Sequence, residues 1–177
     1  MIRYFLIFCA VLHISTFSTT ATATRLQSGP ELKEIVLKID PADLEITPKN
    51  FKHPVWGIIM EMGLAEGRIT LIALADGSTT LYFSNGSGLN GGGENLAVRQ
   101  AAGHYLLGAQ YFYGQSTPSN EYPDPEKGEV RFTFLAFDGH TSFSALESDL
   151  IAQKEPISNL YLAASKVVAE LKNMQAQ

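Results

Sequence analysis

The sequence predicts an α+β domain in which amphipathic helices pack on a five-stranded, mostly antiparallel sheet. Two hairpin signals, Asp76-Gly77 and Asp138-Gly139, each separate apolar runs of strand length. Helical apolar stripes run through residues 94–114 and through the chain beyond Pro156. Together these patterns predict the element order α-β-β-β-α-β-β-α, with each hairpin supplying neighbouring strands.

Residues 1–23 have the pattern of a secretory signal peptide. Arg3 precedes an apolar run over residues 4–14, and Ala21-Thr22-Ala23 forms a small-residue cleavage site. The run is shorter than the ~20 residues of a membrane span, although an uncleaved anchor is the alternative. We expect a secreted or periplasmic protein whose single domain covers residues 24–177 and which has no stable membrane span after cleavage.

Composition excludes several classes of function. The chain has 13 Lys and Arg against 18 Asp and Glu, a net charge of −5, and no basic run, so nucleic-acid binding is not expected. The only cysteine, Cys9, lies in the predicted leader, which leaves no disulfide and no thiol nucleophile. The histidines have no metal-binding spacing such as H-x-H or H-E-x-x-H, and we expect no metal and no cofactor.

The first predicted helix covers residues 30–39. It begins at a proline, carries acids in its first turn, and ends near Asp40-Pro41. Its apolar side chains have helical spacing: Leu32, Ile35, Val36 and Ile39. Alternation of Ile35, Leu37 and Ile39 leaves a strand as the alternative.

Three strands are predicted at residues 55–63, 68–75 and 78–84. A type I′ turn at Asp76-Gly77 pairs Leu74 with Thr79 and Thr70 with Phe83. Both sides of this hairpin are apolar, which predicts a central position in the sheet, covered on both faces.

The second half contains a helix, an exposed loop, a hairpin and a final helix. The helix over residues 94–114 stops at Gly114, and residues 116–128 form a proline-rich loop. In the hairpin, the predicted core face consists of Val130, Phe132, Phe134, Ala136, Phe143 and Ala145. The last helix buries Ile157, Leu160, Ala164, Val167, Val168 and Leu171.

The glycine-rich segment between the third strand and the next helix is the leading candidate for a binding site. Five glycines fall between Gly86 and Gly93, so the backbone can take positive φ or approach a ligand closely, and a helix N-terminus favours anions. The candidate ligand-binding residues of this segment are Asn85, Gly86, Ser87, Asn90, Gly91, Gly92, Gly93 and Glu94. A structural crossover is the alternative role.

This segment does not have the context of a nucleotide loop. Gly86-Ser87-Gly88-Leu89-Asn90-Gly91 matches G-x-G-x-x-G, but the preceding strand belongs to a hairpin rather than to a parallel βαβ unit. No lysine follows Gly91, and Glu94 places a carboxylate where a phosphate would lie.

Glu61 and His104 are the two further candidate site residues. Glu61 interrupts an apolar strand; a four-residue turn after Gly63 pairs it with Thr70, beside Phe83, where its pKa would be raised. A solvent-facing strand position is the alternative for Glu61, and the edge of a helical stripe is the alternative for His104. No G-x-S-x-G elbow supports a serine hydrolase, and no catalytic residue is assigned.

Two aromatic side chains of the long helix, Tyr111 and Tyr113, lie off its apolar stripe, and Tyr122 lies in the loop after it. Exposed aromatic residues are typical of interfaces, so these three side chains indicate a contact surface.

Three stretches of the sequence stand out together with the glycines that follow them: Val55-Trp56-Gly57-Ile58-Ile59-Met60-Glu61, Ala73-Leu74-Ala75-Asp76-Gly77 and Leu81-Tyr82-Phe83-Ser84. They resemble a family of small uncharacterised bacterial proteins. The resemblance is dense from residue 55 to about 102 and thinner from residue 131 onward. That resemblance implies no catalytic role. The element order resembles the roadblock/profilin-like group, whose members are mostly interaction modules, but a fold does not determine a function.

We therefore expect an exported binding or protein-interaction module rather than an enzyme. Its partner is an unknown protein or small ligand, and an exposed edge strand allows a homodimer by sheet pairing. The second hypothesis is a small enzyme whose site combines Glu61, His104 and residues 85–94.

Overall fold

The computed structural model describes residues 31–90 and 92–176, so the predicted signal peptide and Gly91 lie outside the described residues. The helices are α1 (Glu31–Lys38), α2 (Leu96–Phe112), α3 (Glu147–Ile151) and α4 (Ser158–Gln175), with 3₁₀ turns at Pro41–Leu44, Gly92–Glu94 and Tyr113–Gln115. The strands are β1 (Val55–Gly63), β2 (Arg68–Leu74), β3 (Thr79–Phe83), β4 (Gly88–Leu89), β5 (Thr117–Pro118), β6 (Glu129–Ala136) and β7 (Gly139–Leu146). None of the helices in the described part of the chain combines the length and the hydropathy that a membrane span requires.

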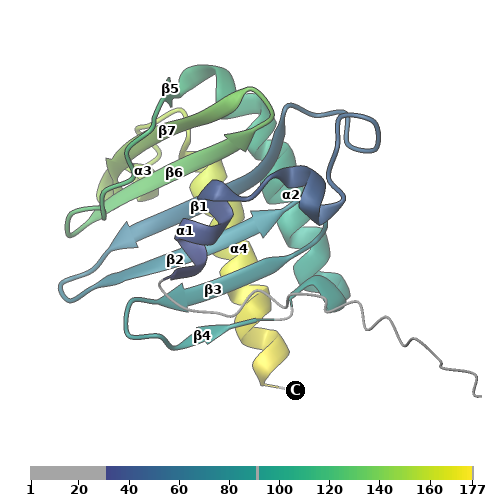
Figure 1. Ribbon diagram of the computed structural model, residues 1–177. Coiled ribbons are helices and arrows are strands. Elements are labelled where there is room, and N and C mark those ends of the chain that lie inside the picture. Colours follow the sequence, from purple (N-terminus) through teal and green to yellow (C-terminus); the bar gives the residue numbers. More distant parts are fainter. Residues whose placement is uncertain (1–30, 91, 177) are drawn as a thin grey trace, which may run out of the picture.

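The strands form one sheet in the order β4-β3-β2-β1-β6-β7-β5, and each named pair is antiparallel (Figure 1). The predicted α+β class is confirmed, but the predicted strand number is wrong: the sheet has seven strands rather than five. The two additional strands, β4 and β5, have two residues each, which is too short to produce an alternating pattern in the sequence.

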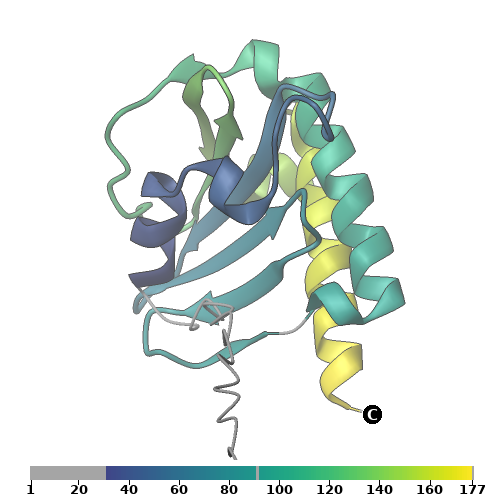
Figure 2. The same ribbon diagram turned by 45° about the vertical axis from the view of Figure 1, so that its right-hand side comes forward.

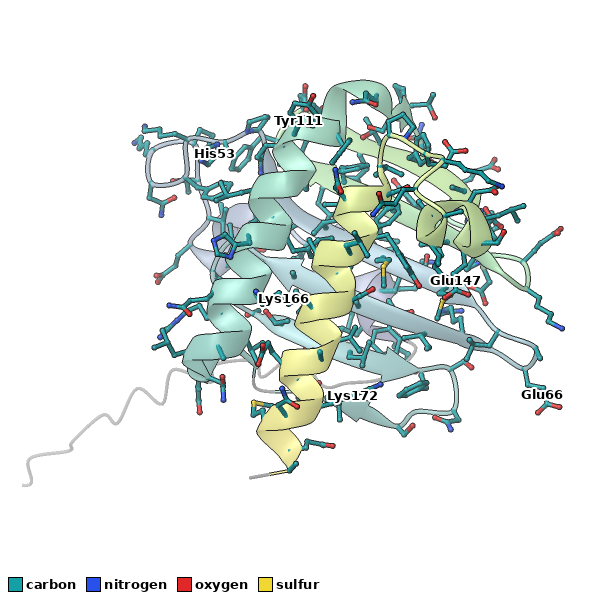
Figure 3. The ribbon with its side chains drawn as sticks, turned by 180° about the vertical axis from the view of Figure 1, so that it is seen from behind. His53, Glu66, Tyr111, Glu147, Lys166 and Lys172 are labelled. Atoms are coloured by element: carbon teal, nitrogen blue, oxygen red, sulfur yellow. The ribbon has the colours of Figure 1, made fainter. Side chains whose placement is uncertain are left out.

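Helices cover both faces of the sheet, and each face has its own apolar core. Helices α2 and α4 pack side by side over one face (Figures 2 and 3), where they bury residues such as Ile58, Leu71 and Phe132. Helix α1 packs on the opposite face through Leu32 and Val36 (Figure 2). The second core consists of Leu32, Val36, Ile46, Trp56, Ile59, Ile72, Leu74, Tyr82 and Leu135.

The predicted register of the β2–β3 hairpin is wrong by one residue. Thr70 lies opposite Tyr82 and Leu71 opposite Leu81, because the loop has three residues, 75–77, rather than two. The Leu74 carbonyl accepts a hydrogen bond from Gly77 N (3.0 Å), and Gly77 has φ +91°. A left-handed glycine that closes the loop is typical of three-residue hairpins.

The second hairpin has the predicted core face. Phe132 lies opposite Phe143 and Val130 opposite Ala145, and these side chains belong to the core under α2 and α4. The β2–β3 hairpin lies inside the sheet, as predicted, because β3 also pairs with β4 and β2 also pairs with β1. The last five residues of β2 are buried.

The predicted helices are present with shifted ends. Helix α2 begins two residues later than predicted, at Leu96, because Asn95 caps it. It ends at Phe112, and a 3₁₀ turn covers the last predicted residues. The short helix α3, which leads into α4, was not predicted.

Candidate functional site

The first part of the glycine-rich segment is a hairpin turn. Residues 84–87 connect β3 to β4, and Gly86 has φ +86°, a conformation that favours glycine. The Asn85 side-chain oxygen accepts hydrogen bonds from Ser87 N (3.0 Å) and from Ser87 Oγ (2.7 Å). Asn85 and Ser87 thus stabilise the turn in which they lie, and both are exposed.

Gly93 lies where the chain approaches the β2–β3 turn. A Cβ atom on Gly93 would lie 2.9 Å from the Gly77 carbonyl oxygen, closer than ordinary van der Waals contact. The N-terminus of α2 is also occupied, because the Asn95 side chain accepts hydrogen bonds from Ala97 N (3.0 Å) and Val98 N (3.2 Å). Glu94 and Asn90 are exposed. These contacts stabilise the β3–β4 turn and the start of α2.

The structure does not bring Glu61 and His104 together. His104 is exposed on α2, whereas Glu61 points to the opposite face of the sheet, where α1 packs. The predicted pairing of Glu61 with Thr70 is confirmed, but the next residue across the sheet is Tyr82 rather than Phe83, as the corrected register requires. The solvent-facing alternative for Glu61 is wrong, since only 1% of its side chain is exposed.

Glu61 belongs to a cluster of four charged side chains from four segments of the chain. Its Oε2 lies 2.9 Å from Lys33 Nζ of α1, and its Oε1 lies 3.2 Å from Arg68 Nε of β2. Asp124, in the segment before β6, forms an ion pair with Arg68 Nη1 and lies 3.8 Å from Lys33 Nζ. We call Lys33, Glu61, Arg68 and Asp124 the charge cluster.

Burial dominates the electrostatics of Glu61. Removal from water raises the pKa of its carboxyl, and this effect exceeds the opposing effects of Lys33 and Arg68. Among the described residues, neither Glu61 oxygen accepts a well-aligned hydrogen bond, so the two cations hold it by charge and proximity. Such a buried pair contributes little net stability, because desolvation offsets the attraction.

The segment 119–124 is tied to the same face as α1. Lys33 Nζ donates to the Tyr122 carbonyl (2.8 Å), and Arg131 Nη1 donates to the Pro123 carbonyl. The Tyr122 hydroxyl donates to the Ser119 carbonyl (2.7 Å) and lies 3.1 Å from His140 Nδ1. Burial lowers the pKa of His140. The predicted exposed loop is therefore anchored by side chains at several points.

A groove lies between this segment and strands β6 and β7. The segment between β5 and β6 arches away from the sheet (Figure 2), and the groove beneath it has a volume of about 540 Å³. Its lining is mostly polar and uncharged: Gln115, Thr117, Ser119, Glu121, Pro123, Arg131, Ser142, Phe143 and Ser144. Within it, Arg131 Nε donates to Ser144 Oγ (3.1 Å).

The groove runs along the outer edge of β7. The carbonyls of His140 and Ser142 point to that edge, since they accept hydrogen bonds from Ser119 N (3.1 Å) and Thr117 Oγ1 (3.3 Å). Main-chain groups alternate between the two edges of a strand, so Ser144 points the same way. Strand β5 pairs only with Thr141 and Ser142 and stops short of Ser144.

Comparison with known proteins does not place the chain in a family. No family model, curated protein or solved structure matches it. Its chemistry is therefore inferred from the groove and the charge cluster.

A second, smaller hollow of about 320 Å³ lies at the β2–β3 turn against α2. Phe51, His53, Asp76, Arg99 and Leu107 are among its lining residues. It is lined by none of the residues of the charge cluster, and no hydrogen bond or ion pair links its lining residues His53, Asp76 and Arg99 to one another within the described residues.

The three tyrosines proposed as a contact surface are not equivalent. The side chain of Tyr111 is 76% exposed, near the same end of the molecule as His53 (Figure 3). Tyr113 OH instead donates to Asp138 Oδ1 (2.6 Å), a bond that raises the tyrosine pKa to about 12. Tyr122 packs against His140, and Tyr111 packs edge-on against Phe112, so of the three tyrosines only Tyr111 combines such packing with a largely exposed ring.

Sequence reasoning found one member of the charge cluster and missed three. The interruption of an apolar strand indicated Glu61, but Lys33, Arg68 and Asp124 come from three other segments with no regular spacing. No group of three potential metal ligands occurs among the described residues.

Proposed function

We propose that this protein is an exported, non-catalytic binding module that holds an extended polypeptide segment along the free edge of β7. The observation that supports this proposal is the early end of β5. It leaves the main chain of Ser144 facing a groove of about 540 Å³ rather than a neighbouring strand. An unpaired strand edge is a template for an added strand.

The lining of the groove suits this occupant. Hydroxyl and amide groups of Gln115, Thr117 and Ser142 can accept and donate hydrogen bonds, and Glu121 and Arg131 add one charge of each sign. Main-chain pairing supplies affinity in this mode of recognition, and side-chain pockets next to the strand supply selectivity.

The polar groups of the groove have structural partners that do not activate them for catalysis. Ser144 Oγ accepts a hydrogen bond from Arg131 Nε, and Ser119 Oγ donates to the Glu121 carbonyl. A nucleophilic serine needs an adjacent general base, and neither contact provides one. Glu61 and His104, on opposite faces of the sheet, have no common substrate position.

The test is selection of 12-residue peptides from a displayed random library on the wild-type domain, followed by affinity measurement on two variants. Ser144→Pro removes the N–H that faces the free edge, and proline is tolerated there because that N–H does not pair with β6. We expect this variant to lose the selected peptides. Ser144→Ala, the matched control, keeps the N–H and should retain them.

Equal peptide affinity in the wild type and Ser144→Pro would overturn the proposal. Loss of affinity in both variants would also overturn it, because the hydroxyl rather than the main chain would then be the determinant. The other possible occupant of the groove is a second copy of the chain. Size-exclusion chromatography of the wild type tests this, because such an occupant would make the protein a dimer. A dimer that Ser144→Pro dissociates would replace the peptide in this proposal.

A further inference from the structure

We propose that Lys33 and Arg68 form an oxyanion-binding site that Asp124 occupies in this structure, and that an external carboxylate or phosphate takes its place when bound. The site is separate from the β7 edge, and the inference does not depend on the function proposed above. Asp124 acts here as an internal substitute for the ligand.

The charges of the buried members are not balanced. Lys33 and Arg68 are 3% and 12% exposed and carry two positive charges, whereas Glu61, 1% exposed, carries one negative charge. The fourth charge, Asp124, is 65% exposed. The buried part of the cluster thus has one uncompensated positive charge, and the anion that neutralises it lies at the surface.

The geometry of the cations suits an anion with two or more oxygens. Arg68 Nε donates to Thr70 Oγ1 (3.4 Å) and lies 3.2 Å from Glu61 Oε1, whereas Nη1 forms the ion pair with the surface anion Asp124. Lys33 Nζ lies 3.8 Å from Asp124, beyond hydrogen-bond distance but close enough for attraction. A carboxylate or phosphate that lay closer to Lys33 would contact both cations directly. Asp124 contacts Arg68 directly but not Lys33.

Stability does not account for this arrangement. Two cations and a carboxylate are removed from water between α1 and the sheet, where apolar side chains of similar size would pack at lower cost. Glu61 Oε2 lies 2.9 Å from Lys33 Nζ and Glu61 Oε1 lies 3.2 Å from Arg68 Nε, so one buried carboxylate faces two cations. The second anion beside them, Asp124, is exposed and is the one that an external anion would replace.

The experiment uses the full domain after leader removal and two probes, sodium phosphate and sodium acetate, at constant ionic strength set with sodium chloride. Binding is measured by calorimetry and by the NMR shift of the Arg68 Nε–H signal. In Asp124→Asn the internal competitor is lost. We expect its dissociation constant for at least one probe to be about tenfold lower than that of the wild type, because apparent affinity scales with the fraction of open sites.

Three further variants make the result decisive. Asp124→Glu keeps a carboxylate and should bind as weakly as the wild type, whereas Asp124→Ser should resemble Asp124→Asn. Asp149→Asn removes one carboxylate from another surface ion pair, with Lys154 at 3.0 Å, and should leave affinity unchanged. Since Asp124 is largely exposed, its variants should fold, which circular dichroism checks.

The two probes distinguish the source of the ligand: tighter binding of acetate indicates an acidic side chain or organic acid, and tighter binding of phosphate indicates a phosphorylated group. The proposal fails if Asp124→Asn binds neither probe more tightly than the wild type. It also fails if Asp149→Asn gains as much affinity, or if binding leaves the Arg68 signal unmoved.

Discussion

Lys33 Nζ of α1 lies 2.9 Å from Glu61 Oε2 of β1, and both side chains are almost fully buried. This contact joins the N-terminal helix to the central strand of the sheet (Figure 1). Around it, an apolar core that includes Trp56 and Leu32 fills the space between the helix and the sheet. Helix α1 is therefore held on this face of the sheet by one internal ion pair and a small hydrophobic core.

Replacement of Lys33 by methionine should destabilise the domain by about 3 kcal/mol at pH 7, because the Glu61 carboxylate loses a buried partner. The loss should be smaller in the double variant Lys33→Met/Glu61→Gln, which buries neither charge of this pair. Urea unfolding of the wild type, the two single variants Lys33→Met and Glu61→Gln, and the double variant gives the coupling energy between the two side chains. Lys38→Met, which removes a 76% exposed ammonium of the same helix, is the control and should change stability by less than about 0.5 kcal/mol. Additive losses would contradict the coupling.

Glu61→Gln should gain stability relative to the wild type as pH rises from 4 to 7. Burial raises the pKa of Glu61 above the ordinary value of 4.5, so the folded state binds this proton more tightly than the unfolded state. Its contribution to stability is complete below the unfolded pKa and is lost as pH rises through the folded pKa. Lys33 keeps Asp124 and the Tyr122 carbonyl as partners in the variant. Urea unfolding at several pH values measures the difference, and a constant or falling difference would refute the expectation.

The contribution of His140 to the stability of the domain should have the opposite pH dependence. Burial lowers its pKa from the ordinary 6.5, so the unfolded state takes up a proton first as pH falls. The wild type should therefore lose stability relative to His140→Gln between pH 7 and pH 5. NMR titration of the His140 ring should show an inflection below 6.5. An inflection at or above that value would be inconsistent with a half-buried ring next to Tyr122.

Gly93→Ala should destabilise the domain by about 1–3 kcal/mol, because its Cβ would lie 2.9 Å from the Gly77 carbonyl oxygen. Gly103→Ala is the matched control. A Cβ on Gly103 meets no atom within 4 Å, and alanine is the better helix former, so this variant should gain about 1 kcal/mol. Thermal unfolding compares the two. A neutral Gly93→Ala would remove the structural role given to the glycine-rich segment.

Leu32→Ala should cost about 2–5 kcal/mol, since Leu32 is 2% exposed in the core beneath α1. Ile35→Ala, on the outer side of the same helix and 46% exposed, should cost much less. Trp56, the single tryptophan of the chain, lies in this core and reports unfolding by fluorescence. Similar losses in both variants would indicate that α1 does not pack as described.

The sequence by itself determined the α+β class, the five longer strands and the main helices, because their apolar periodicity is repeated over many residues. It also placed Glu61 opposite Thr70, since the length of the loop after Gly63 sets that register. The Asp76-Gly77 signal located a turn but not its length, and a single additional loop residue moved Tyr82 into the place predicted for Phe83. Two-residue strands left no pattern to detect.

Only the tertiary structure decided which face each candidate residue occupies and which residues it meets. His104 is exposed on α2, whereas Glu61 lies on the opposite face of the sheet. Lys33 and Arg68 reach Glu61 from two other segments, and Asp124 joins them from a third. The groove likewise depends on where β5 stops pairing with β7. Local periodicity records which side of an element is apolar, whereas contacts between distant segments depend on packing and register, which no short stretch of sequence encodes.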